Sequence, residues 1–156
     1  MEDGADMKVP VDGDMLLSAN RAYVAVSTLI VPGLTTTGQH ALAFQLGRSA
    51  EAIPRLIALA FTSADRPAAI HEHLNEAVIE TYEVVVRLTH CRGGPLTPAD
   101  QQLCELLIAV YEGIGRRIFL LTGASEQQRG KEDTSPCASA LERRTHRERF
   151  PTLGTS

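Results

Sequence analysis

The residues of this chain that could bind a metal ion are concentrated between residues 71 and 91. Histidine, cysteine and glutamate are common ligands of zinc and iron, but their side chains must converge on one point. His71 and His73 are two residues apart and would point in different directions on a helix. The Glu-x-x-His motif that supplies di-iron ligands in helical bundles is missing from every predicted helix. We therefore predict surface or helix-capping roles, no metal site and no cofactor, and keep a metal-binding bundle as a third alternative. The candidate ligands are His71, Glu72, His73, His90 and Cys91.

A catalytic site needs a nucleophile, a base and a group that orients the base. Ser49 lies between Arg48 and Glu51 and is the best-placed hydroxyl, but no histidine is near it in the sequence. We predict no catalytic residue and no enzymatic activity.

Arginines that could contact phosphate groups occur in two predicted helices and in a cluster near the C-terminus. Arg48 and Arg55 lie in the second predicted helix, and Arg116 and Arg117 lie in the fourth. The formal net charge of −4 and the acidic N-terminus oppose a general affinity for nucleic acid. Both interpretations stay open: a nucleic-acid-binding surface, or a solvated face with a charged tail. The C-terminal cluster contains Arg143, Arg144, Arg147 and Arg149.

Composition and periodicity favour one helical domain. The chain has 156 residues, no tryptophan and 44% hydrophobic residues, which suits helix-on-helix packing. Apolar residues recur at helical spacing in four segments separated by short turns, which predicts an all-α fold: an antiparallel, up-down-up-down four-helix bundle. The three cysteines are odd in number and widely spaced, so they indicate a reducing, cytoplasmic setting and no disulfide framework. The expected domains are a flexible acidic tail at 1–13, the bundle at 14–123 and a mostly disordered tail at 124–156.

Capping residues mark the expected helix ends. Asp14 would cap a first helix that ends at Pro32-Gly33, and Thr36 with Gln39 would form a capping box for the second helix. The third helix would run from about residue 67 to residue 92. The fourth would start with a Thr97 cap and Pro98 and close at Gly123. Because Pro32-Gly33 and Gly38 interrupt the stretch without charged residues between Arg21 and Arg48, we expect no membrane span.

The second helix carries the most informative feature of the sequence, which is an interior proline. Pro54 lacks a backbone N–H and its ring clashes with the carbonyl group of Ala50, at a cost of roughly 3 kcal/mol. We therefore predict a proline-kinked second helix that is stabilised by its surroundings. Several large apolar residues of this helix lie outside its main stripe, which predicts either a wide core face or a subunit interface. These residues are Phe44, Leu56, Leu59 and Phe61.

The segment from Gln45 to Ala58 resembles a known family. It matches the glutamine, basic residue, small residues, Ile-Pro and Ile-Ala pair found in the four-helix-bundle proteins encoded in intervening sequences of bacterial 23S rRNA genes. The accessory variability proteins of diversity-generating retroelements are similar to that family. Gly47 replaces one of two basic residues, and Leu56, Leu59 and Ala60 replace polar or small family residues.

The resemblance implies a non-enzymatic homo-oligomer, commonly a homopentamer. For the retroelement branch it implies an adaptor that binds a reverse transcriptase and nucleic acid, either RNA or DNA. This is our first functional hypothesis, with Arg48, Arg55, Arg116 and Arg117 as the contact residues. The alternative is a bundle that binds only protein, which the net negative charge and the extra apolar residues favour.

Overall fold

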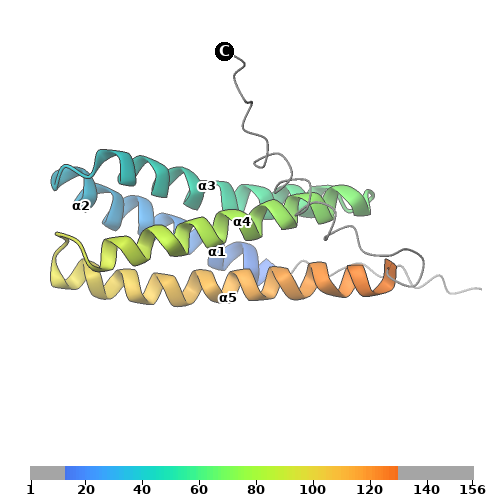
Figure 1. Ribbon diagram of the computed structural model, residues 1–156. Helices are drawn as coiled ribbons and strands as arrows, with labels where there is room; N and C mark the ends of the chain where they lie inside the picture. The colour runs from blue at the N-terminus through green and yellow to red at the C-terminus, as the bar shows by residue number, and fades with distance from the viewer. Residues whose placement is uncertain (1–12, 130–156) are drawn as a thin grey trace, which may run out of the picture. The chain divides into compact units, whose positions relative to one another are not determined.

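The computed structural model describes residues 13–129, with side chains described as far as residue 123, and its regular structure is entirely helical (Figure 1). Successive helices run antiparallel and are joined by connections of three, four and five residues. This confirms the predicted all-α four-helix bundle. The predicted tails lie outside the described residues, apart from Gly13 and a short stretch before residue 130. The elements are α1 (Gly13–Ala25), the π-helical segment η1 (Val26–Ile30), α2 (Val31–Thr36), α3 (His40–Thr62), α4 (Pro67–Arg92) and α5 (Pro98–Arg129).

The first helix continues through Pro32-Gly33, so the predicted end at this pair is wrong. The physical reason lies in η1, where the Val31 N–H donates to the Val26 carbonyl five residues earlier. A π-helical turn is wider than an α-helical turn and displaces the carbonyl groups that a following proline ring would meet. The chain therefore accommodates Pro32 inside one continuous helix composed of α1, η1 and α2.

The first helix ends instead at a Schellman motif. Gly38 has φ of 81°, the Gln39 N–H donates to the Leu34 carbonyl at 2.8 Å, and the Gly38 N–H donates to the Thr35 carbonyl at 3.1 Å. The predicted capping box is also wrong. The Thr36 hydroxyl donates to the Pro32 carbonyl at 2.8 Å within the first helix, and no side chain caps the start of α3.

The continuity of the first helix affects the reasoning behind the predicted absence of a membrane span. By length and composition alone, the 24 residues from Gly13 to Thr36 could cross a membrane, and the core helix of a soluble protein passes the same test. Pro32-Gly33 does not divide this stretch, because α1, η1 and α2 follow one another without a gap. One face of the helix is buried in the bundle, at Met15, Ala19, Ala22, Val26, Ile30 and Leu34.

The central helix is α3, which packs against both the first helix and α4. Pro54 lies inside it as predicted, and the helix is assigned without a break from His40 to Thr62. The proline is buried, and its neighbours Ile53 and Ile57 are completely buried. This burial offsets the cost of the missing hydrogen bond.

The last helix begins where the sequence predicts and ends later. Thr97 caps α5, because its hydroxyl accepts a hydrogen bond from the Asp100 N–H at 3.2 Å. The predicted end at Gly123 is wrong, since the helix continues to Arg129. A glycine ends a helix when it adopts a positive φ, and Gly38 is the glycine that does so among residues 13–129.

Candidate functional site

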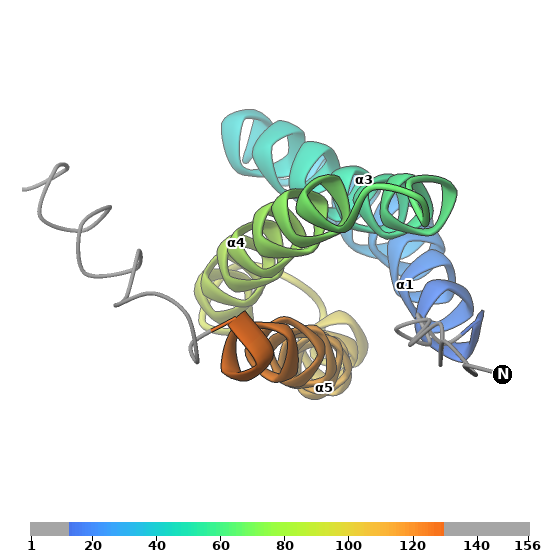
Figure 2. The same ribbon diagram turned by 90° about the vertical axis from the view of Figure 1, so that its right-hand side faces the viewer.

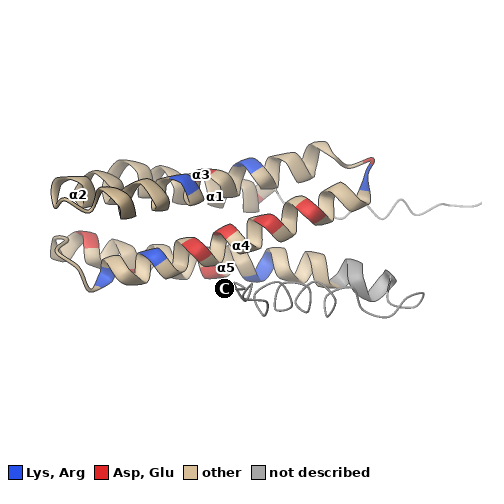
Figure 3. Cartoon of the chain, turned by 45° about the horizontal axis from the view of Figure 1, so that its top comes forward, with Lys and Arg blue, Asp and Glu red and all other residues tan. Residues whose placement is uncertain are grey.

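The predicted phosphate-binding arginines are all exposed, but the fold does not gather them into one patch. Arg48 and Arg55 lie on α3, and Arg116 and Arg117 lie on α5. Helix α4 lies between α3 and α5 in two perpendicular views (Figures 1 and 2) and carries a row of acidic residues (Figure 3). The two pairs of arginines therefore belong to separate surfaces.

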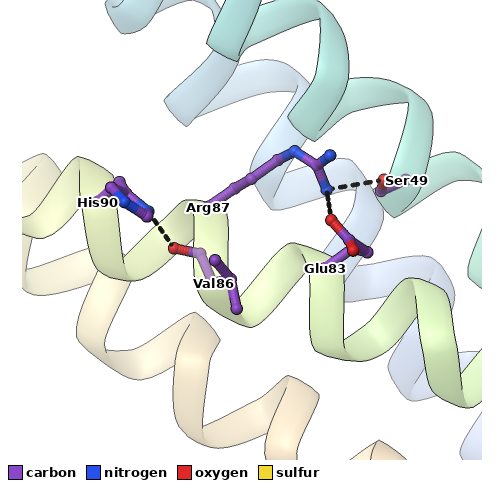
Figure 4. Close-up of polar contacts among 5 residues, drawn as sticks. All are labelled: Ser49, Glu83, Val86, Arg87 and His90. Atoms are coloured by element: carbon purple, nitrogen blue, oxygen red, sulfur yellow. Dashed lines mark hydrogen bonds and ion pairs between the residues drawn. The ribbon is translucent and has the colours of Figure 1, made fainter. Parts of the chain in front are cut away.

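A different arginine has a structural role between α3 and α4. The Nη1 atom of Arg87 lies 2.8 Å from Oε2 of Glu83 and donates to the Ser49 hydroxyl oxygen at 3.3 Å (Figure 4). Ser49 is 7% exposed and bonds to a cation that can only donate hydrogen bonds.

The candidate metal ligands are not brought together. Among residues 13–123, whose side chains the structure describes, no group of three or more histidine, cysteine, aspartate or glutamate side chains has a geometry that could hold a metal ion. Nδ1 of His90 lies 2.8 Å from the Val86 carbonyl oxygen, within its own helix (Figure 4). Val86 lies six residues before the end of α4 at Arg92, so this contact is not the bond to a terminal carbonyl group that the predicted capping role requires.

The four predicted interface residues divide into two groups. Phe44 is 70% exposed and Leu59 is 42% exposed, so both are available on the surface of α3. Leu56 belongs to the core, which contradicts its prediction as an interface residue, and Phe61 is half-buried against the core. The spread of large residues around α3 thus reflects a wide core face as well as an exposed one.

An open apolar groove of about 500 Å³ lies between α4 and α5. Its rim carries three large side chains that the fold leaves in solvent: Tyr82, Phe119 and Leu120 are 70%, 66% and 69% exposed. Helix α4 contributes Val78, Thr81, Tyr82 and Val85, and α5 contributes Tyr111, Glu112, Gly115, Arg116, Phe119 and Leu120.

The floor of the groove is formed where the two helices approach closely. A Cβ atom at Gly115 would lie 3.3 Å from Cγ2 of Thr81, which would be a tight contact, so the glycine allows the two helices to approach closely. Thr81 is buried, and its hydroxyl donates to the Ala77 carbonyl at 2.7 Å. Tyr111 is completely buried beside them, and its hydroxyl has no hydrogen-bond partner among the described residues. Burial raises the pKa of Tyr111 because the phenolate form would lose its hydration.

The thiols of Cys91 and Cys104 meet between α4 and α5. Their hydrogen bond lowers the pKa of Cys91 and, together with burial, raises the pKa of Cys104. Both residues are buried and have free thiols. Burial and the raised pKa of Cys104 are typical of a packing residue.

Sequence reasoning missed the groove, although its signal was present. Ile79, Tyr82, Phe119 and Leu120 are large apolar residues that lie outside the stripes of their helices, and all four are exposed. No family model, curated protein or solved structure matches this chain. The function must therefore be inferred from the groove and the surface, and the family resemblance stays a prediction.

Proposed function

We propose that this protein is a non-enzymatic adaptor that binds an apolar helix of another protein in the groove between α4 and α5. The observation that carries the proposal is the exposure of Tyr82, Phe119 and Leu120 around one apolar groove. Aromatic side chains are enriched among the residues that dominate binding energy, and an amphipathic helix is a common occupant of such grooves. Glu112 and Arg116 lie in the groove lining and would orient the occupant through its charges.

Site-specific photo-crosslinking tests this proposal. A photo-reactive phenylalanine analogue replaces Phe119 in one variant and Phe44 in another, in the cells that make the protein. The two phenylalanines are almost equally exposed, but Phe44 lies on α3, away from the groove. We expect a discrete adduct with another protein at position 119 and none at position 44. Tyr82→Ala should reduce the yield of that adduct about tenfold, which corresponds to about 1.4 kcal/mol of binding energy.

Two results would contradict the proposal that the groove binds a helix of another protein. One is the same set of adducts at both positions, because a specific site cannot explain them. The other is an adduct at position 119 that contains only copies of this chain.

Contact with nucleic acid is a second candidate function. It is supported by Arg48 and Arg55, which are both exposed on one helix and seven residues apart, so that they face nearly the same direction. Phe44 is exposed on the same helix and could stack on a base. The reverse transcriptase partner and the pentameric ring implied by the resemblance stay predictions.

Charge reversal on α3 tests the second candidate. If α3 contacts phosphate groups, Arg48→Glu with Arg55→Glu weakens binding of single-stranded RNA or DNA at least tenfold at low salt. Arg116→Glu with Arg117→Glu is the control on the other surface and has a smaller effect. Fluorescence anisotropy at several salt concentrations measures both. Equal affinity of the wild type and the α3 variant would leave only the protein-binding function.

A further inference from the structure

Cys91 and Cys104 lie at the same level of two helices that pack closely. Thr81 of α4 faces Gly115 of α5, where a Cβ atom would lie 3.3 Å from the threonine Cγ2. The two cysteines are found ten residues further along α4 and eleven residues back along α5. Because a helix rises about 1.5 Å per residue, these steps reach nearly the same level of the antiparallel pair.

The two thiols face each other inside the fold. Cys91 is 1% exposed and Cys104 is completely buried, and a hydrogen bond joins their side chains. Two thiols in hydrogen-bond contact can form a disulfide through side-chain rotation and a small shift of their helices. The contact is therefore more than the packing of two small apolar residues.

We propose that Cys91 and Cys104 are a peroxide-sensitive pair that forms an intramolecular disulfide bond and so fastens α5 to α4. The Cys91 thiolate attacks one oxygen of hydrogen peroxide, the O–O bond breaks, and hydroxide leaves. Cys104 then loses its proton and attacks the sulfur of the resulting sulfenic acid, and hydroxide leaves again. Each hydroxide takes up one of the two thiol protons. Two thiols and one peroxide thus give one disulfide and two water molecules.

The position of Cys91 gives the oxidant a route to a buried thiol. Cys91 lies next to Arg92, the last residue of α4, and a connection that starts with two glycines follows. The end of a helix opens at a lower free-energy cost than its middle, and peroxide is only slightly larger than water. The hydrogen bond with Cys104 also lowers the pKa of Cys91, and the thiolate is the form of cysteine that attacks.

This disulfide goes beyond the groove function and does not depend on it. The groove is lined by residues from 78–85 of α4 and 111–120 of α5, whereas both cysteines lie nearer the connection between the helices. The sequence predicts a reducing setting, in which the two thiols stay free, so the bond would form on exposure to peroxide. Because the bond closes a loop in the unfolded chain, it lowers the entropy of that state and stabilises the fold.

Peptide mapping of the full chain tests the pair. The reduced protein is treated with equimolar hydrogen peroxide, catalase removes the excess, and the remaining thiols are alkylated in denaturant before digestion with trypsin. We expect the peptides of Cys91 and Cys104 to be linked to each other in at least tenfold excess over any link to the peptide of Cys137. Dithiothreitol should reverse the link. Trypsin places the three cysteines in separate peptides, which are 88–92, 93–116 and 132–143.

Denaturant unfolding measures the effect of the bond on stability. Oxidation should lower the equilibrium constant for unfolding at least tenfold, because the bond restricts the unfolded chain. Cys104→Ala and Cys137→Ala are treated in the same way. Peroxide should not stabilise the first variant, which also controls for oxidation of methionine, whereas the second should gain stability as the wild type does.

Four results would overturn the proposal. The first is a main product in which Cys137 is linked to another cysteine. The second is sulfinic acid at Cys91 or Cys104 without a bond between them, and the third is two thiols that stay reduced in a large excess of peroxide. The fourth is a linked protein that is no more stable than the reduced one, because a bond that strains the fold would not fasten α5 to α4.

Discussion

Replacing Leu56 with alanine should lower the free energy of unfolding by about 2–5 kcal/mol, whereas Leu59→Ala should lower it by less than about 1 kcal/mol. The two leucines are three residues apart on α3, but Leu56 is 5% exposed and Leu59 is 42% exposed. Truncation of Leu56 removes buried surface and leaves a cavity beside the core, while truncation of Leu59 removes atoms that water already reaches. Denaturant unfolding followed by circular dichroism measures both values.

The losses of unfolding free energy in the two variants distinguish the apolar residues of α3 that belong to the core from those that a partner could contact. Equal and small losses for both variants would place Leu56 on the surface and would revive its assignment to a subunit interface. A large loss for Leu56 alone would identify it as a core residue. It would leave Phe44 and Leu59 as the members of the predicted interface that remain available to a partner.

Raising the pH above about 10 should destabilise the wild type more than the Tyr111→Phe variant. In the unfolded chain Tyr111 loses its proton near pH 10, but burial raises its pKa in the folded protein. The folded state therefore binds this proton more tightly than the unfolded chain does. The contribution of this proton to the free energy of unfolding is fully present below pH 10 and is lost as the pH rises above it. The expected slope is up to about 1.4 kcal/mol per pH unit from this one group.

The difference between the wild type and Tyr111→Phe separates the effect of Tyr111 on stability from the effects of other groups that titrate at high pH. Cys104, whose pKa is also raised, is unchanged in both proteins, so its contribution cancels in the difference. At pH 7 Tyr111→Phe should be at least as stable as the wild type, because it removes a buried hydroxyl with no partner. Parallel pH dependence of the two proteins would show that the hydroxyl reaches water or a partner in solution.

Much of the fold could be predicted because helical periodicity reports directly on burial. The buried stripe of α3 and the Thr97 cap followed from residue type and spacing. The two prolines show where this reasoning fails. The sequence predicts Pro54 inside a helix, and the structure has it there. It also predicts a helix end at Pro32, which is wrong because apolar spacing cannot reveal the wide turn at Val26–Ile30 that accommodates this proline.

The candidate groove was less predictable because it depends on which helices are neighbours. Tyr82 and Phe119 are separated by more than thirty residues, and only the packing of Thr81 against Gly115 places them around one groove. The four predicted contact arginines, Arg48, Arg55, Arg116 and Arg117, are all exposed. Their separation by acidic α4 follows from the order of the helices in space, which a linear pattern does not contain.

The continuous first helix has a consequence for biosynthesis. It leaves the ribosome before α3, against which it packs, and the stretch from Ala22 to Gly47 contains no lysine, arginine, aspartate or glutamate. A nascent chain at this stage exposes the part of this helix from Ala22 onwards, which has no charged side chain to keep it apart from other chains. Helix α3 is synthesised next and covers the first helix early, whereas α5 is synthesised last. We expect the incomplete bundle to be most prone to self-association before α5 is synthesised.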